Sequence, residues 1–219
     1  NMIKHTLALA LTFSAVSLPT AASAATQITQ SLDTNSSWTV TNLTTNVTTT
    51  AVVPSSVPGT YNAPNNAPVN GAQYIYPTTT TNAPGNTTFA FTRVFTIPAF
   101  AQLSTARLIG TLWADNNIVS ILLNGVLITN PVTTGNESFN GAGIALNTGG
   151  NFLFGTNTVV FNVFNQAGGG TNPVALRADL DAVYAVPEPG TWMLMLLGFG
   201  AIGFAMRSRA KTRVRFQFA

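Results

Sequence analysis

Apolar and polar residues alternate with a period of two in the best-defined segments of the chain. From residue 89 to 96, three phenylalanines alternate with small or hydroxyl-bearing residues. From residue 176 to 183, leucine and alanine alternate with residues that are mainly charged. A period of two is typical of a strand that buries one face. Both segments are therefore predicted to be strands packed on a common core.

The clearest turn signal is the dipeptide Asn124-Gly125, which lies between the apolar runs 118–123 and 126–128. A two-residue type I′ hairpin needs positive φ at both central residues, and Asn and Gly tolerate this best. We therefore predict a hairpin here. Its turn should set the register of the two strands, because a slip of one residue would move every side chain to the opposite face.

Further β-rich segments occur between residues 25 and 186, separated by turns and by polar, proline-containing loops at 54–71 and 78–86. These segments are 38–40, 47–53, 73–76, 107–113, 152–154 and 158–165. About eight short strands with turn signals between them are typical of an antiparallel β-sandwich. The predicted fold class is therefore all-β, with one domain over 25–186.

The N-terminal segment has the order of a secretory signal peptide. Lys4 precedes an apolar run at 7–18, and Ala22-Ser23-Ala24 supplies small residues at a cleavage site. A charged start, a short apolar region and a small-x-small site define such signals. Residues 2–24 are predicted to be removed, so that Ala25 begins the mature chain.

The C-terminal segment contains an uncharged apolar run at 191–206 followed by a basic cluster. As a helix, this run would extend roughly 24 Å at about 1.5 Å per residue. This is shorter than a hydrocarbon core of about 30 Å. Trp192 at one interface and arginines reaching out at the other would compensate for the difference. We therefore expect a transmembrane helix over 191–206.

Within this segment, a fixed order of residues stands out, formed by Pro187, Glu188, Pro189, Trp192, Arg207 and Arg209. The order resembles the PEP-CTERM sorting signal, with a motif at 187–192, the helix, and a basic tail at 207–219. The resemblance implies an exosortase-like membrane protease as a partner. It also implies export in a Gram-negative bacterium, a transient inner-membrane anchor, and a final place at the cell surface or in the extracellular matrix. The alternative is an ordinary tail anchor, which does not account for the Pro-Glu-Pro tripeptide.

The formal charge of +3 comes from the two targeting segments. Between residues 25 and 185, three arginines accompany five acidic residues, so this region has a formal charge of −2 and no lysine. Binding to nucleic acid needs clustered positive charge, so nucleic acid is not an expected partner. The chain also has no cysteine, so disulfides do not stabilise the domain.

Catalytic signatures are missing from the predicted mature chain. The single histidine, His5, lies in the signal peptide, which excludes histidine-based nucleophilic or metal sites. No glycine-rich run carries the lysine of a phosphate-binding loop. We therefore predict that the protein is not an enzyme and has no catalytic residues, with calcium as the one candidate cofactor.

A second pattern extends over 105–179, where an Asp-Asn loop at 115–116, the Asn124-Gly125 hairpin and the segment 155–157 follow one another. This pattern is similar to that of galactose-binding-like jelly rolls, many of which bind carbohydrate. The resemblance implies a jelly-roll-like sandwich. Within it, Asp115, Asn116 and Asn117 form a candidate sugar-contacting loop, and Trp113 is a candidate for stacking on a sugar ring. The alternative reading of the loop is a turn capped by side-chain hydrogen bonds, with the tryptophan in the core.

Asp179 and Asp181 lie two residues apart on a predicted strand and therefore share a face. Such a pair is a candidate for binding calcium or for glycoside hydrolysis, and the alternative is a solvated face. Taken together, the sequence predicts an exported domain that binds exopolysaccharide or another glycan. A structural surface or filament subunit and a glycan-active enzyme are the alternatives.

Overall fold

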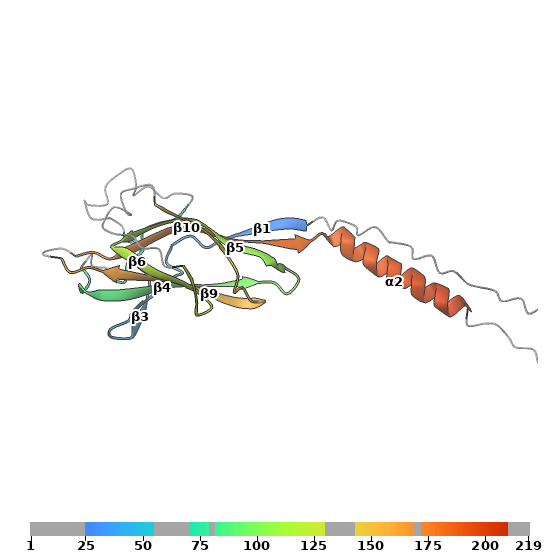
Figure 1. The fold of residues 1–219 in the computed structure, drawn as a ribbon, viewed down its shortest axis with the longest axis horizontal. Coiled ribbons are helices and arrows are strands. Elements are labelled where there is room, and N and C mark those ends of the chain that lie inside the picture. Colours follow the sequence, from blue (N-terminus) through green and yellow to red (C-terminus); the bar gives the residue numbers. More distant parts are fainter. Residues whose placement is uncertain (1–24, 55–70, 79–81, 130–142, 169–171, 210–219) are drawn as a thin grey trace, which may run out of the picture.

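The computed structural model describes residues 25–54, 71–78, 82–129, 143–168 and 172–209. These residues form strands and one C-terminal helix (Figure 1). The elements are β1 (Ala25–Ser31), β2 (Thr39–Asn42), β3 (Val47–Thr50), β4 (Thr87–Ile97), β5 (Gln102–Asp115), β6 (Asn117–Leu123), β7 (Val126–Thr129), β8 (Ile144–Gly149), β9 (Gly155–Asn165), β10 (Ala175–Pro187) and α2 (Pro189–Arg209). The predicted signal peptide at 2–24 lies outside the described residues.

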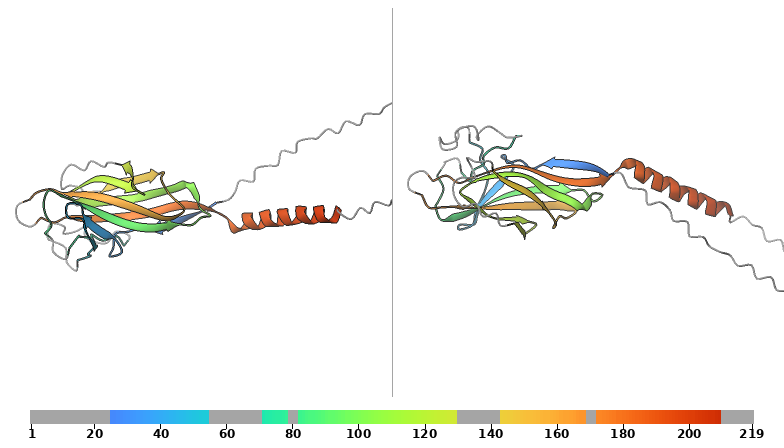
Figure 2. Two further views of the ribbon diagram at one scale, coloured as in Figure 1. Left: turned by 90° about the horizontal axis from the view of Figure 1, so that it is seen from below. Right: turned by 45° about the horizontal axis from the view of Figure 1, so that its top comes forward.

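The strands build two antiparallel sheets. One sheet has the order β1-β10-β5-β8, and the other has the order β3-β2-β4-β9-β6-β7. The two sheets lie face to face as an elongated layered body, and α2 extends from one end (Figures 1 and 2). The prediction of an all-β antiparallel sandwich is confirmed. The finer jelly-roll identification stays a prediction.

The core between the sheets follows from the alternation seen in the sequence. Phe91 of β4 lies opposite Phe161 of β9 in the ladder, and both side chains are fully buried. Trp38, just before β2, packs on Phe161 with ring centroids 5.7 Å apart. Its indole Nε1 donates hydrogen bonds to the carbonyl oxygens of Leu32 and Asp33, at 3.2 Å and 3.1 Å. The indole is therefore buried without leaving its polar atom unpaired.

The predicted hairpin is confirmed at Asn124-Gly125. The two residues have φ values of 53° and 79°, as a type I′ turn requires. The Asn124 side chain accepts a hydrogen bond from the N–H of Thr158 at 2.9 Å and donates one to Asn157 Oδ1 at 2.9 Å. The turn is therefore attached to the start of β9, and the two asparagines that carried the jelly-roll resemblance serve a structural role here.

Two strands predicted from the sequence are wrong in detail. The segment 73–76 forms only isolated bridges, one from Tyr76 to Val52 and one from Ile75 to Leu176. Because these partners belong to different sides of the sandwich, the segment cannot continue a ladder with either. The segment 152–154 is irregular because the Asn157 side chain takes both backbone groups of Leu153, at 2.8 Å each.

Two strands were not predicted from the sequence. Both β1 and β8 lie at the edges of the four-stranded sheet, where only one neighbour stabilises the strand. Their sequences mix hydroxyl, amide and aliphatic residues without a clear period. In the structure, β1 pairs with the end of β10 from Ala25↔Pro187 to Ser31↔Asp181. The predicted start of the mature chain therefore lies beside the Pro-Glu-Pro tripeptide.

The predicted C-terminal helix is present as α2. Among the residues that the structure describes, no helix is both long and apolar enough to cross a membrane.

Candidate functional site

The Pro-Glu-Pro tripeptide lies at the junction of two regular elements. Pro187 is the last residue of β10, and Pro189 is the first residue of α2. Proline suits a helix start because its missing N–H has no partner there in any case and its φ is already helical. Glu188 alone lies between the two elements, and its side chain is exposed. The backbone at the tripeptide is therefore held in structure on both sides of one acidic residue.

Beyond the junction, α2 exposes apolar side chains on all of its sides. The exposed large side chains are Trp192, Met193, Leu194, Met195, Leu196, Leu197, Phe199, Ile202, Phe204 and Met206. Arg207 is exposed at the end of the helix, and Arg209 is its last residue. A helix that is apolar all round is suited to an apolar environment rather than to water. None of its described side chains is buried against the sandwich.

The predicted ligand loop at the end of β5 is brought together but lies inside the protein. Trp113, Asp115 and Asn116 are all less than a tenth exposed, and Asn117 is half-buried at the start of β6. Asn116 Nδ2 donates to Asp115 Oδ1 at 2.7 Å, while Asn116 Oδ1 accepts the N–H of Gln166 at 2.6 Å. These are the side-chain bonds of a capped loop. A ligand-binding role for the four residues stays a prediction.

A buried cation that the sequence analysis missed explains the position of Trp113. Arg177 of β10 lies opposite Trp113 in the ladder, and its guanidinium carbon is 4.0 Å from the centroid of the indole and 5.0 Å from that of Tyr74. Arginine held over aromatic faces is stabilised by their quadrupoles. One face of Trp113 is therefore occupied by this cation.

Burial shifts the pKa values of the groups around Trp113, which are Tyr74, Tyr76 and Arg177. Desolvation raises the pKa of Tyr74 to about 12, with the positive charge of Arg177 opposing the shift and Asp115 adding to it. Desolvation also raises the pKa of Tyr76, and it lowers that of Arg177. Both tyrosines are therefore neutral at physiological pH, which fits packing of their rings and not acid–base chemistry.

The predicted calcium pair has a third acidic neighbour. The N–H of Leu180 donates to Asp33 Oδ1 at 2.9 Å, which places Asp33 beside β10 between Asp179 and Asp181. Desolvation and then the charges of Asp33 and Asp179 raise the pKa of Asp181. Across the described residues, no group of three or more histidine, cysteine or acidic side chains is arranged to hold a metal ion. Calcium at Asp179 and Asp181 stays a prediction.

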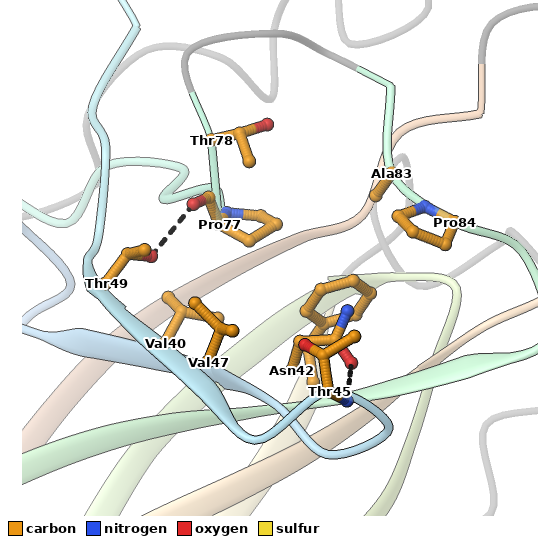
Figure 3. Close-up of a pocket in the computed structure, with 10 residues that line it drawn as sticks. Val40, Asn42, Thr45, Val47, Thr49, Pro77, Thr78, Ala83 and Pro84 are labelled. Atoms are coloured by element: carbon orange, nitrogen blue, oxygen red, sulfur yellow. Dashed lines mark hydrogen bonds between the residues drawn. The ribbon is translucent and has the colours of Figure 1, made fainter.

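A pocket of about 300 Å³ opens beside the β2–β3 hairpin (Figure 3). It is lined by Val40, Asn42, Thr45, Val47, Thr49, Pro77, Thr78, Ala83, Pro84 and Phe89. Thr49 Oγ1 donates to the carbonyl oxygen of Pro77 at 3.0 Å, and Asn42 Oδ1 accepts the N–H of Thr45 at 3.2 Å. The sequence contained no signal for this pocket because its lining comes from three separate segments.

Comparison with known protein families identifies the C-terminal junction. Residues 185–210 match the PEP-CTERM protein-sorting motif, so the resemblance proposed from the sequence is confirmed there. Searches among curated proteins and among solved structures found no match, so neither supports the galactose-binding-like resemblance. The chain carries a sorting motif that begins at the end of β10, and this motif marks an exported protein that an exosortase sorts to the cell surface.

Proposed function

We propose that the β-sandwich is a glycan-binding domain of the cell surface or extracellular matrix, and that it acts without catalysis. The observation that carries this proposal is the pocket beside β2 and β3, which combines apolar walls with hydroxyl and amide groups. Sugar rings present an apolar C–H face and polar edges. Ligand pockets generally pair apolar walls with a few polar groups that set orientation.

The pocket is suited to the end of a glycan chain. Phe89 and the two prolines offer flat apolar surface, and Asn42, Thr45 and Thr78 supply polar groups at its edge. Its volume of about 300 Å³ is at the lower end of the range for ligand pockets. One terminal sugar unit is therefore a better fit than an internal segment of a long polysaccharide.

A matched pair of substitutions on β3 tests this proposal. Thr49 lines the pocket, whereas Thr48 lies on the opposite face, where its hydroxyl meets that of Thr41 at 2.8 Å. We expect Thr49→Trp to fill the pocket and weaken binding on an array of terminal mono- and disaccharides by about tenfold or more. Thr48→Trp should leave binding unchanged.

Equal binding by wild type and Thr49→Trp would exclude the pocket as the glycan site. The array should be run with and without calcium, because loss of binding after chelation would favour a role for Asp179 and Asp181. A chain that binds none of the glycans under either condition contradicts the proposal as a whole.

We further propose that sorting cleaves the chain at or near Glu188. This residue is exposed and lies outside both β10 and α2, so its backbone is the most accessible part of the junction. In a host that carries the sorting enzyme, the intact mass of the released protein should correspond to a chain ending between Pro187 and Pro189. A released species that still ends at Ala219 would contradict this.

A structural-subunit role is the second candidate, and the edges of both sheets favour it. The edge strands β1, β3, β7 and β8 contain no charged residue and no proline, although proteins commonly use both to prevent edge-to-edge pairing. Analytical ultracentrifugation of the released protein distinguishes the roles. Association that Gln27→Lys on β1 or Thr48→Lys on β3 abolishes would support a subunit.

A further inference from the structure

Three large apolar side chains are exposed together at one end of the sandwich, and we call them the apolar tip. Phe100 lies in the turn between β4 and β5 and is 57% exposed. Leu153 and Phe154 precede β9, and each is 53% exposed. Exposed aromatic and aliphatic groups that gather in one place commonly mark an interaction surface.

The apolar tip is at the same end as the sorting motif. In the ladder between β4 and β9, Ile97 pairs with Gly155, so Phe100 and Phe154 both lie just beyond the last pair. Gln102 at the start of β5 pairs with Ala185, two residues before Pro187. The turn at 98–101 is seen at the end of the sandwich from which α2 departs (Figures 1 and 2).

Charge at this end argues against a lipid surface as the partner. The region 25–185 has a formal charge of −2 and no lysine, whereas peripheral binding to anionic lipid relies on basic residues beside the apolar ones. Arg107 of β5 lies near this end, and its Nε donates to Asn147 Oδ1 at 2.7 Å. An uncharged apolar surface is better matched by an apolar surface on a protein.

We propose that the apolar tip is a secondary contact surface for the sorting enzyme that acts on the Pro-Glu-Pro junction. An enzyme that engages Glu188 must approach this end of the sandwich, because β10 holds the backbone up to Pro187. Burial of exposed phenylalanine and leucine side chains in that encounter then adds binding free energy. The motif supplies the cleavage site, and the tip increases the rate at which this particular chain is processed.

The inference rests on the proposed cleavage near Glu188, and a matched control lies at the opposite end of the sandwich. Leu43 is 45% exposed, and it belongs to the β2–β3 hairpin beside Thr88, where its N–H donates to the carbonyl oxygen of Thr88 at 3.0 Å. Full-length chains carrying Phe100→Ser with Phe154→Ser, or Leu43→Ser as the hairpin variant, would be followed by pulse-chase in a host with the sorting enzyme.

We expect the tip variant to be processed about tenfold more slowly, the factor that corresponds to about 1.4 kcal/mol. The hairpin variant should match wild type, and both variants should melt like wild type because the substituted side chains are exposed. If the wild-type chain is processed and the tip variant is processed at the same rate, the inference is overturned and the cleavage proposal stands. A wild-type chain that stays at full length overturns both.

Photocrosslinking identifies the partner directly. With p-benzoylphenylalanine in place of Phe100 in the full-length chain, we expect a covalent adduct with the sorting enzyme that is absent when the same group replaces Leu43. Adducts with phospholipid alone would overturn the proposal in favour of membrane contact.

Discussion

The sandwich buries most of its large apolar residues, whereas α2 exposes them. Strands β4 and β9 alternate, so that phenylalanines such as Phe91 and Phe161 are fully buried between the sheets. Helix α2 contains a comparable density of large apolar residues, yet Leu194 is 72% exposed and Phe204 is 77% exposed. The same residue types therefore stabilise the fold in one region and remain outside it in the other.

This difference separates folding from sorting. The sandwich buries its apolar core between its own two sheets, so its stability should depend on residues 25–187. The helix gains nothing from the sandwich, so its apolar surface is available to the sorting machinery that the PEP-CTERM motif specifies. The two regions join at the Pro-Glu-Pro junction, where β1 pairs with the last residues of β10. Substitutions that act on one region and not on the other test this separation.

The largest expected effect is at the centre of the core. Replacing Trp38 with alanine removes a fully buried indole that contacts Phe161, and such a loss costs about 3–5 kcal/mol. Thermal and urea melts of the full chain, followed by circular dichroism, measure this change. The matched substitution in α2, Phe199→Ala, should leave the melt of the sandwich unchanged. A destabilised Phe199→Ala chain would show that α2 contributes to the fold.

A second substitution addresses the buried cation. Arg177→Ala removes the guanidinium that lies over Trp113 and Tyr74, and we expect a loss of about 2–3 kcal/mol from two cation–π contacts and the packing of the side chain. Arg177→Met keeps an apolar side chain of similar length and should recover part of the loss. Arg107→Ala, at an exposed site, should cost less than about 1 kcal/mol. Equal urea midpoints for Arg177→Ala and Arg107→Ala would show that the contacts of Arg177 with Trp113 and Tyr74 do not contribute to the stability of the fold.

A substitution in the Asn124-Gly125 hairpin should lower the stability of the sandwich by less than the loss of Trp38 or Arg177. Gly125 has φ of +79°, and a Cβ placed there meets no atom within 4 Å. Gly125→Val therefore introduces backbone strain without a clash, at a cost of about 1–2 kcal/mol. Gly200→Val in α2 is the control, since its added side chain also meets nothing within 4 Å and its backbone is helical. If both variants melt like wild type, positive φ at Gly125 does not constrain the register.

The smallest effect should come from Asp181, and it should depend on pH. Burial and the charges of Asp33 and Asp179 raise the pKa of this carboxyl in the folded state above its ordinary value of 3.8. The folded chain therefore binds a proton more tightly than the unfolded chain, so stability falls as pH rises through this range. Asp181→Asn should stabilise the sandwich at neutral pH by less than about 1 kcal/mol.

The difference between Asp181→Asn and wild type should disappear below the ordinary pKa of the carboxyl, where it is protonated in both states. Melts at neutral and acidic pH measure it. Added calcium offers a further check, because a metal bound by Asp179 and Asp181 would reverse the sign and make the wild type the more stable chain.

Local pattern was enough to predict much of the fold. The period of two in β4 and β10, the positive-φ turn at Asn124-Gly125 and the order of residues in the sorting motif all depend on neighbours a few positions apart. Their physical causes operate within one element. The sequence alone therefore determined the all-β class, the hairpin and the identity of the C-terminal segment.

The contents of the candidate sites depended on tertiary structure. The strand register places Arg177 over Trp113, and the pocket joins the β2–β3 hairpin to the pairs 77–78 and 83–84 and to Phe89. These contacts join residues far apart in the chain. The alternation of residues within one strand does not specify which other strand pairs with it. For the same reason, β1 and β8 were missed as edge strands, and the loop at Trp113 and Asp115 could be named from sequence while its burial could not. Only the packing of the two sheets decided which aromatic residues are buried and which remain exposed at the apolar tip.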